Sequence, residues 1–188
     1  EPGLAGNGQM NEGEVATRLG LAGIPAEAEV MMIERDLRLV EMTGARYHVA
    51  HVSTAASVEV IREAKARGLS VTCDTAPHYF ALNDTSVMDY RTFTKVSPPL
   101  RDENDRVGVI RGLRDGTIDV IASDHRPQDQ DSKRRPFTQA ESGIVGLETL
   151  LPLTLALYHS EHIPLIHLVK RLTAAPGKLL DMKEGRLG

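Results

Sequence analysis

The feature that most constrains the fold is an alternation of short apolar runs with longer segments of helical periodicity. Strands are expected at 46–51, 69–73 and 117–123, and helices are expected at 26–43, 54–67, 102–114, 147–159 and 165–172. This order is typical of an α/β domain with a parallel sheet. A complete eight-fold barrel needs about 250 residues, whereas this chain has 188. The pattern therefore predicts either a small open α/β domain or a piece of a barrel.

The clearest of these helices is the one expected at 26–43. Pro25 precedes it, and a proline is favoured where a helix begins because its missing N–H needs no partner there. Glu27 and Glu29 suit the positive end of the helix, and Gly44 is a common type of stop. Beyond the helices, the stretches 75–101 and 126–142 and the first 25 residues are expected to be loop-rich, and a last short helix is expected near Lys178–Met182.

Composition excludes several classes of protein. The chain is 41% hydrophobic and 26% charged, with a formal net charge of -4, which is ordinary for a soluble globular domain. No long basic run is present, which argues against nucleic acid or an anionic membrane as partner. The single cysteine, Cys73, cannot form an internal disulfide and fits a reducing cytoplasm. With no apolar segment of membrane-spanning length and no signal peptide, the sequence predicts a cytoplasmic protein.

Two of the expected strands end in side chains that can bind a metal. The run 117–123 is followed by Asp124 and His125, and the run 46–51 ends in His51. In α/β barrels, catalytic groups collect at this end of the strands. A carboxylate can bind a metal and accept a proton from water, and an imidazole nitrogen is a common metal ligand. The pair predicts a metal site, although a capping role for Asp124 and a core position for His51 are the simpler alternatives.

The other histidines near these strand ends are expected to play different parts. His48 should face away from His51, because side chains alternate along a regular strand, so the two should not share one site. His125 is next to Asp124 and is therefore a poor co-ligand. His78 follows a third strand and is expected to pack and form hydrogen bonds beside the site rather than to bind the metal.

Two further segments could contact a substrate. The turn 95–101 contains two prolines and could direct Ser97 or Arg101 towards an anionic substrate, although it could equally be a loop stiffener. The segment 143–148 opens a helix, whose free N–H groups could hold a carboxylate, but its glycines could instead serve packing alone. Neither segment matches a dinucleotide or phosphate-loop fingerprint.

A series of motifs runs through the whole chain: EPGLAG at 1–6, NEG at 11–13, GIPAEAE at 23–29, HVST at 51–54, APH at 76–78, SPPLR at 97–101, IASDH at 121–125 and GIVGLET at 143–149. In this order they resemble the motifs of bacterial dihydroorotases. The resemblance implies a TIM-type (β/α)8 barrel of the metal-dependent amidohydrolases with zinc as cofactor. It also implies interconversion of N-carbamoyl-L-aspartate and L-dihydroorotate in pyrimidine biosynthesis.

The resemblance also implies roles for particular residues. His51 resembles a zinc ligand, and Asp124 resembles the ligand that also acts as the catalytic base. The positions that resemble substrate-contacting ones are Ser97, Gln128, Ser142 and Gly143.

At several positions this chain departs from the family. The family commonly has Asn in place of Ser97, His in place of Gln128 and an aromatic residue in place of Ser142. Glu1 stands where an Asp is usual, just downstream of another ligand His that this chain does not contain.

The family's remaining ligands are also outside this chain: the paired His-X-His and a bridging acidic or lysine ligand. Residues 184–188 resemble the segment that leads into the family's small β-domain. We therefore expect residues 1–188 to form a single C-terminal portion of the barrel, without its N-terminal strands and small β-domain. Because a catalytic zinc usually has three protein ligands, we expect this portion to be inactive alone and its further ligands to lie in the missing part.

Two alternative functions remain open on sequence grounds. One is a catalytically inactive dihydroorotase-like subunit that supports aspartate transcarbamoylase; the changes at Ser97, Gln128 and Ser142 favour it, and the retention of His51 and Asp124 opposes it. The other is an allantoinase- or hydantoinase-type hydrolase. In either enzyme the partner would be a small-molecule substrate, and a homo-oligomer is compatible with all three functions.

Overall fold

A parallel three-stranded sheet organises the computed structural model, which describes residues 1–183. Its strands are β3 (Tyr47–Val49), β4 (Val71–Thr75) and β5 (Val120–Ile121), in the order β3-β4-β5. Since all three run in the same direction, the loops that follow them leave from the same edge of the sheet. A separate two-stranded parallel sheet consists of β1 (Met10–Asn11) and β2 (Gly23–Ile24).

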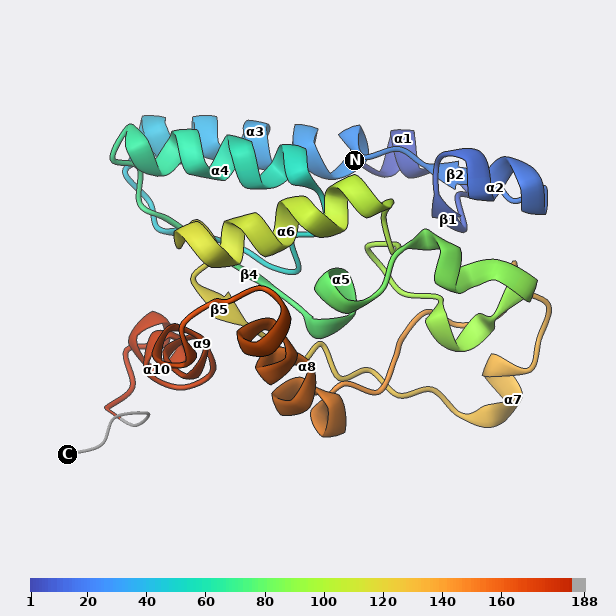
Figure 1. Cartoon of the computed structure of the whole chain (residues 1–188). Helices are drawn as coiled ribbons and strands as arrows, with labels where there is room; N and C mark the ends of the chain where they lie inside the picture. The colour runs from blue at the N-terminus through green and yellow to red at the C-terminus, as the bar shows by residue number, and fades with distance from the viewer. Residues whose placement is uncertain (184–188) are drawn as a thin grey trace.

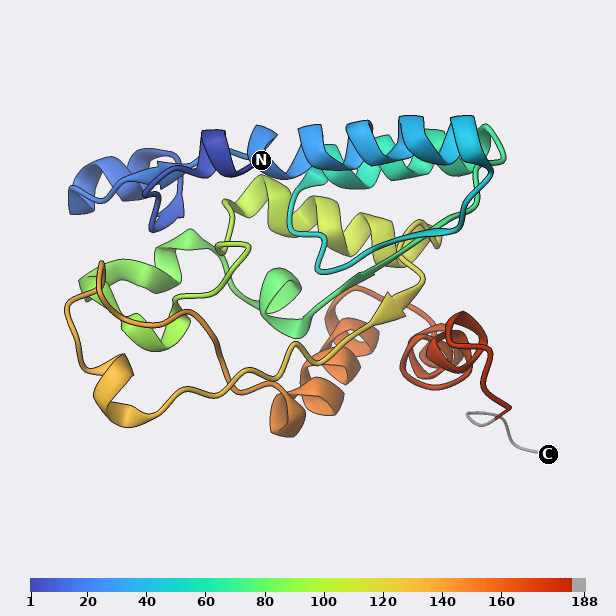
Figure 2. The same ribbon diagram turned by 180° about the vertical axis from the view of Figure 1, so that it is seen from behind.

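Helices make up most of the remaining structure. They are α1 (Pro2–Ala5), α2 (Glu14–Leu19), α3 (Glu27–Thr43), α4 (Ala55–Ala66), α5 (Pro77–Ala81), α6 (Glu103–Asp115), α7 (Gln130–Lys133), α8 (Leu147–Ser160), α9 (Leu165–Leu172) and α10 (Ala174–Leu179), with 3-10 segments η1 (Asp84–Tyr90) and η2 (Thr92–Thr94). Helices α3, α4 and α6 lie side by side along one side of the strands, and both views show this layer (Figures 1 and 2). Helices α8, α9 and α10 follow β5 and lie away from the α3 and α4 layer (Figure 1).

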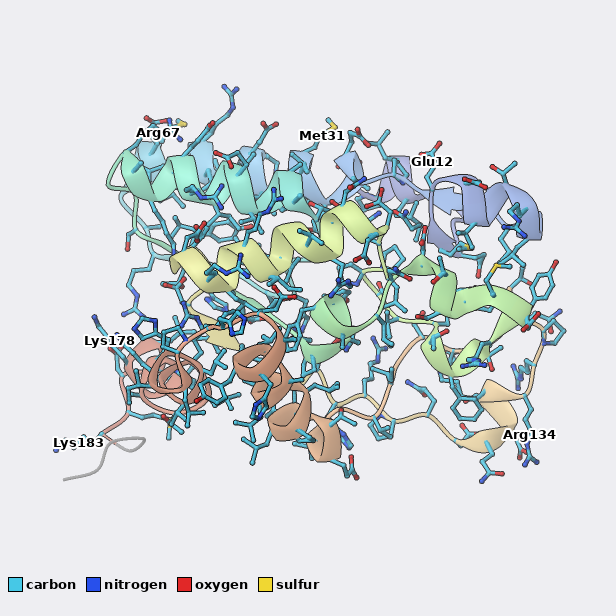
Figure 3. The ribbon with its side chains drawn as sticks, in the orientation of Figure 1. Glu12, Met31, Arg67, Arg134, Lys178 and Lys183 are labelled. Carbon is cyan, nitrogen blue, oxygen red and sulfur yellow. The ribbon has the colours of Figure 1, made fainter. Side chains whose placement is uncertain are left out.

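The main hydrophobic core lies between the sheet and these helices. Strand β4 supplies Val71 and Cys73, and α4 and α6 supply fully buried aliphatic side chains that include Ile61, Val109 and Leu113. The outer face of α3 is open to solvent, where Met31 points away from the strands and is 51% exposed (Figure 3). Within the described part of the chain, no helix has the length and apolar character needed to cross a membrane.

The elements expected from the sequence are largely confirmed. The three expected strands and five long helices are all present, with ends shifted by up to three residues. The last helix was placed wrongly, at Lys178–Met182 rather than at α10. Pro176 lies in the first turn of α10, where a proline removes no helical hydrogen bond. The short strands β1 and β2 were not expected, and the segment 184–188 lies outside the described residues.

A close crossing of α4 and α6 depends on a glycine. A Cβ atom at Gly108 would lie 2.4 Å from the Cβ and 2.8 Å from the Cα of Ala55, far inside normal contact distance. We therefore expect Gly108→Leu to force the two helices apart and to lower the free energy of unfolding by about 1–3 kcal/mol. Urea unfolding measures the change, and Arg111→Leu on the exposed face of the same helix is the control. An unchanged midpoint for Gly108→Leu would contradict this packing.

Candidate metal and substrate site

Three side chains meet where β3, β4 and β5 end. His51 follows β3, His78 lies in α5 just after β4, and Asp124 follows β5. The Nε2 atom of His51 lies 3.6 Å from Oδ1 of Asp124, and Nε2 of His78 lies 3.4 Å from Oδ2 of the same carboxylate. The parallel sheet thus brings together residues that are far apart in the sequence. His78 is buried beside Asp124, but within the described part of the chain its Nε2 forms no hydrogen bond, contrary to the hydrogen-bonded position expected from the sequence.

The backbone is unusual at His51 and Asp124. Their φ angles are 57° and 43°, in the left-handed region that residues other than glycine rarely occupy. Such positions cost on the order of 1 kcal/mol or more and persist where surrounding contacts impose them, often at functional sites. At both strand ends the left-handed turn redirects a side chain that would otherwise follow the alternation of the strand.

Asp74, on β4, holds His51 in place. Its Oδ1 accepts a hydrogen bond from the backbone N–H of His51 at 2.8 Å, and the ring Nδ1 of His51 lies 3.1 Å from the same oxygen. Its Oδ2 is 2.9 Å from Nε2 of His48, whose Nδ1 is 2.8 Å from the hydroxyl of Thr72. This arrangement leaves Nε2 of His51 directed towards Asp124.

One expectation about these histidines was wrong. His48 and His51 were expected to face opposite sides of the strand, but both rings contact Asp74. The reason is that β3 ends at Val49, so His51 lies beyond the regular strand in its left-handed turn. Of the two rings, it is that of His51 that lies within ion-pair distance of Asp124.

The charges of this cluster are coupled. Burial alone would raise the pKa of Asp74, but hydrogen bonds from His48 and His51 outweigh it and lower the pKa to about 2. Hydrogen bonding to Asp74 in turn raises the pKa of His51, against the opposing effect of burial. Asp74 is therefore ionised at neutral pH and favours a proton on Nδ1 of His51, which leaves Nε2 as the free donor atom.

The spacing of His51 and Asp124 fits a shared metal ion. Two ligands on one tetrahedral zinc, each at about 2.0–2.2 Å, are separated by roughly 3.4 Å, and the observed separation is 3.6 Å. Nε2 of His78 is buried without a hydrogen-bond partner among the described residues, which is uncommon for a polar atom. Across residues 1–183, however, no group of three or more His, Cys, Asp or Glu side chains is arranged to hold a metal. By itself the pair has fewer ligands than a catalytic zinc site needs.

His125 has a structural role instead. Its Nδ1 accepts hydrogen bonds from the backbone N–H groups of Gly146, at 3.1 Å, and Leu147, at 3.2 Å, at the beginning of α8. A Cβ at Gly146 would lie 2.2 Å from the carbonyl oxygen of Ser123. The N–H groups of Gly146 and Leu147 are thus occupied, and Gly146 serves close packing, so these two N–H groups are not free to hold a carboxylate.

The residues expected to contact a substrate lie on two connected loops. The side-chain amide of Gln128 donates to the carbonyl oxygen of Ser142 at 3.1 Å. Gly143 has a φ of 143° and donates its N–H to the carbonyl oxygen of Lys95 at 2.9 Å, two residues before Ser97, which is exposed. The structure thus joins Gln128, Ser142 and Gly143 to one another and to the segment that precedes Ser97.

Two buried lysines connect the same loops by hydrogen bonds. The ammonium group of Lys133 donates to the carbonyl oxygens of Thr92, at 3.0 Å, and Glu141, at 2.8 Å. That of Lys95 donates to the carbonyl oxygen of Phe137 at 2.7 Å. Burial lowers the pKa of both lysines. Each lysine crosses between loops and adds side-chain hydrogen bonds to the backbone bonds that join them, such as those from Gly143 to Lys95 and from Arg126 to Ile144.

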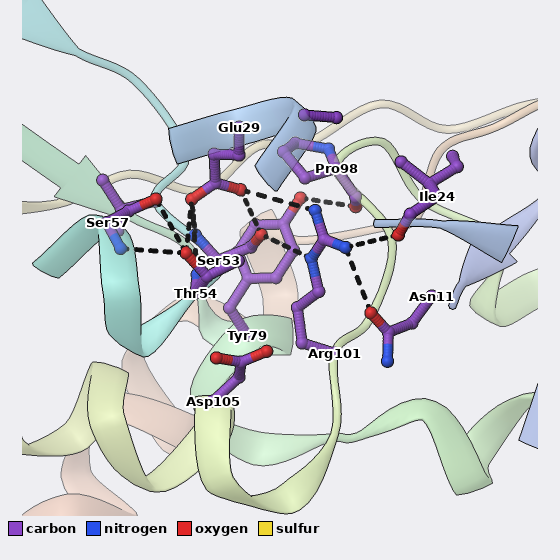
Figure 4. A network of polar contacts seen from close by, with 12 residues as sticks. Asn11, Ile24, Glu29, Ser53, Thr54, Ser57, Tyr79, Pro98, Arg101 and Asp105 are labelled. Atoms are coloured by element: carbon purple, nitrogen blue, oxygen red, sulfur yellow. Dashed lines mark hydrogen bonds and ion pairs between the residues drawn. The ribbon is translucent and has the colours of Figure 1, made fainter. Parts of the chain in front are cut away.

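Arg101 is buried and bonded to other parts of the protein. Its guanidinium is buried and donates to Oδ1 of Asn11 at 3.0 Å, to the carbonyl oxygen of Ile24 at 2.8 Å and to the hydroxyl of Ser53 at 3.2 Å (Figure 4). A carboxylate oxygen of Glu29 lies 3.9 Å away. The possibility that Arg101 binds an anionic substrate is therefore wrong, because its donors are used inside the protein.

A separate hollow lies at the opposite end of the sheet. It has a volume of about 790 Å³ and is lined by residues at or near the beginnings of the strands, among them Arg46, Ser70, Ile118 and Arg171. None of the residues at the strand ends described above lines it, so this cavity is distinct from the candidate site.

Comparison with known proteins points to one family. The family model described as "Dihydro-orotase-like" matches residues 1–57. A dihydroorotase of Pelobacter propionicus is 50% identical over 184 residues, which are 98% of this chain and 43% of that protein. One of Anaplasma phagocytophilum is 46% identical over 98% of this chain and 41% of its own length. The chain thus spans less than half the length of the curated relatives it matches.

Solved structures give the same architecture. A dihydropyrimidinase from Brevibacillus agri superposes with a TM-score of 0.82 at 27% identity, over 88% of this chain and 38% of its own. An L-hydantoinase from Arthrobacter aurescens superposes with a TM-score of 0.75 at 31% identity, over 83% of this chain and 36% of its own. The α/β fold described here therefore matches part of an amidohydrolase barrel, and the sequence-based fold class is confirmed.

Sequence reasoning missed Asp74. The signal was present, because Asp74 follows the apolar run Val71–Cys73 just as Asp124 follows its own strand. The strand had been ended at residue 73, whereas β4 continues to Thr75. Asp74 therefore lies inside the strand, paired beside β5, rather than just beyond the strand's end.

We expect the contribution of Asp74 to stability to depend on pH. Its folded pKa of about 2 is below its ordinary value of 3.8, so the stabilisation is present above pH 4 and is lost as the pH falls towards 2. In chelator-treated protein, Asp74→Asn should lower the free energy of unfolding by about 2 kcal/mol at pH 7. The difference should shrink by about half at pH 3. A difference between the two proteins that stays constant from pH 7 to pH 3 would contradict the hydrogen-bonded, ionised state.

Proposed function

We propose that this chain, a homologue of dihydroorotases over nearly its whole length, forms part of a zinc-dependent cyclic amide hydrolase that interconverts N-carbamoyl-L-aspartate and L-dihydroorotate in pyrimidine biosynthesis. The observation that carries the proposal is the donor pair of His51 and Asp124. These side chains lie at ligand spacing, at the ends of parallel strands, in a chain about half identical to dihydroorotases.

We further propose that residues 1–188 are one portion of the barrel. In the described part of the chain, β3 and β5 are the outer strands of the sheet, and each has an edge to which another strand could add. The donor pair also needs at least one more protein ligand to resemble a catalytic zinc site. Strands and ligands from the rest of a longer protein would supply both.

In this proposal His51 and Asp124 hold the zinc. When bound, zinc polarises the amide carbonyl and lowers the pKa of water. In the hydrolytic direction, water adds to the ring carbonyl carbon while the Asp124 carboxylate accepts the proton of the water. The C–N bond then breaks, and the proton passes from Asp124 to the ring nitrogen. Cyclisation runs the same steps in reverse and releases water.

The neighbours of the donor pair keep it oriented. Asp74 occupies the Nδ1 side of the His51 ring, and His78 approaches the second oxygen of Asp124. Such outer partners of metal ligands fix the tautomer and the direction of the ring. On the substrate side, we propose that the loops carrying Ser97 and the Gln128–Gly143 segment contact the two carboxylates and the ureido group of carbamoyl-aspartate.

A hydantoinase-type activity is the second candidate. It is favoured by the superposition on a dihydropyrimidinase and an L-hydantoinase. An inactive subunit that supports aspartate transcarbamoylase is opposed by the ligand spacing of His51 and Asp124. For the complete protein we propose a cytoplasmic location, consistent with the single, buried, free Cys73, and we leave homo-oligomerisation as a further possibility for any of these functions.

The test of the function is cyclisation of carbamoyl-aspartate by the product of the complete gene, loaded with zinc. Turnover supports the dihydroorotase proposal. Turnover of a hydantoin but not of carbamoyl-aspartate would transfer the proposal to the hydantoinase type. Failure on both substrates by a folded, zinc-loaded protein would contradict both enzymes and favour the inactive subunit.

We expect Asp124→Asn in the full-length protein to reduce kcat by about 10²- to 10⁴-fold, because the amide cannot accept the proton of water. Bound zinc, measured alongside, separates loss of the base from loss of a ligand. Asp131→Asn, at an exposed position of α7, is the matched control and should keep full activity. Turnover of Asp124→Asn close to that of the unchanged protein would remove Asp124 from the mechanism.

We expect His51→Ala to lower the zinc content of the full-length protein by removing a ligand nitrogen. His48→Ala should retain zinc, because the ring of His48 contacts Asp74 and Thr72 rather than Asp124. His159→Ala, at an exposed site, controls for the loss of any histidine. Metal analysis after dialysis gives the comparison, and equal loss from His51→Ala and His48→Ala would show that both rings are needed at the metal.

A further inference from the structure

One carboxylate accepts the hydrogen bonds that hold the loop after His51. Glu29, on α3, accepts hydrogen bonds from the backbone N–H groups of Ser53, at 3.1 Å, and Thr54, at 3.3 Å. It also accepts from the hydroxyl of Ser53 and, at 3.4 Å, from that of Thr54 (Figure 4). The side chain of Glu29 is 12% exposed. A largely buried carboxylate thus accepts from both backbone N–H groups and from the Ser53 hydroxyl of the two residues that follow His51 and Val52, while the Thr54 hydroxyl also lies 2.7 Å from the hydroxyl of Ser57.

Capping of α4 does not explain this arrangement. The N-cap Thr54 already accepts from the N–H of Ser57 at 3.0 Å, and the first N–H of the helix, at Ala55, donates to Asp105 at 2.8 Å. The helix therefore has its own partners. The bonds made by Glu29 act on the loop backbone, at Ser53 and Thr54.

Arg101 connects this loop to the proposed substrate turn. Its Nε donates to the hydroxyl of Ser53, the same hydroxyl that donates to Glu29. Arg101 lies four residues after Ser97 in the SPPLR turn. A buried guanidinium beside a buried carboxylate is costly unless both are well hydrogen-bonded. Here Glu29 bonds to the loop after His51, and Arg101 bonds to that loop and to β1 and β2.

We propose that Glu29, backed by Arg101, is a positioning residue that fixes the left-handed turn at His51 and so presents Nε2 of that ring to the metal. The inference rests on the proposed function, because it assumes that His51 is a ligand. The motifs GIPAEAE, which ends in Glu29, and HVST, which begins with His51, are distant in the sequence but are then joined by these hydrogen bonds. Because the Ser53 hydroxyl contacts both Glu29 and Arg101, the same hydrogen bonds set the position of His51 relative to the Ser97 turn.

The test uses the full-length protein with cobalt(II) as the metal probe, because the visible absorption of bound cobalt reports its ligands. We expect Glu29→Gln to weaken cobalt affinity on the order of tenfold, as loss of an outer partner of a ligand does, and to alter the absorption bands. Glu27→Gln is the matched control, since it removes the same charge from the exposed face of the same helix turn. It should bind cobalt as the unchanged protein does.

Unfolding of the metal-free proteins separates positioning from a purely structural role. Lower stability of Glu29→Gln with unchanged cobalt affinity and bands would overturn the inference. If Glu29→Gln does not fold, Ser53→Ala removes only the hydroxyl shared by Glu29 and Arg101. A several-fold loss of cobalt affinity in that variant supports the inference, and unchanged affinity overturns it. Failure of the unchanged protein to bind cobalt would instead overturn the proposed function and, with it, this inference.

Discussion

The parallel pairing of β3, β4 and β5 is the constraint on which the candidate site depends. Because these strands run in one direction, the residues that follow them, His51, His78 and Asp124, emerge at one edge of the sheet. The register matters as much as the direction. Asp74 pairs with Val120, and a slip of one residue would turn its carboxylate to the other face of the sheet and away from both histidines. The long helices α3, α4 and α6 bury the apolar side chains that fix this register.

The site is supported by buried polar groups that receive hydrogen bonds from several elements. Asp74 holds the ring of His51 from the neighbouring strand, and Glu29 holds the following loop from α3. Burying two carboxylates is unfavourable unless their oxygens are occupied. The positive φ of His51 adds to that cost. Apolar packing in place of Asp74 and Glu29 could stabilise the fold equally well. The two carboxylates are therefore best explained by the need to hold the ring of His51 in one direction.

Sequence periodicity predicted the strands and the long helices, and it placed His51 and Asp124 at strand ends, because each of these depends on local pattern. His51 and Asp124 follow apolar β-favouring runs, and that is a local signal. The strands β1 and β2 were missed because each has two residues, too few to show an alternation. The role of Glu29 could not be predicted, since its partners lie some 25 residues away and helical spacing says only that the side chain is on α3. Arg101 was open to two interpretations for the same reason: its partners come from β1, β2, the β3–α4 loop and α3.

In the proposed enzyme, the residues that determine substrate choice are expected on the loops rather than on the strands and helices. The barrel portion superposes on a dihydropyrimidinase and an L-hydantoinase despite 27% and 31% identity, so the strands and helices do not distinguish these activities. For the proposed enzyme, we therefore expect discrimination to come from the loops at the strand ends. The loops of Ser97 and of Gln128 are joined by the hydrogen bond from Gly143 to Lys95 and by the ammonium group of Lys133. Because these links are side-chain and single backbone bonds rather than a strand ladder, the loops can differ between relatives without disturbing His51 and Asp124, which are anchored on the sheet.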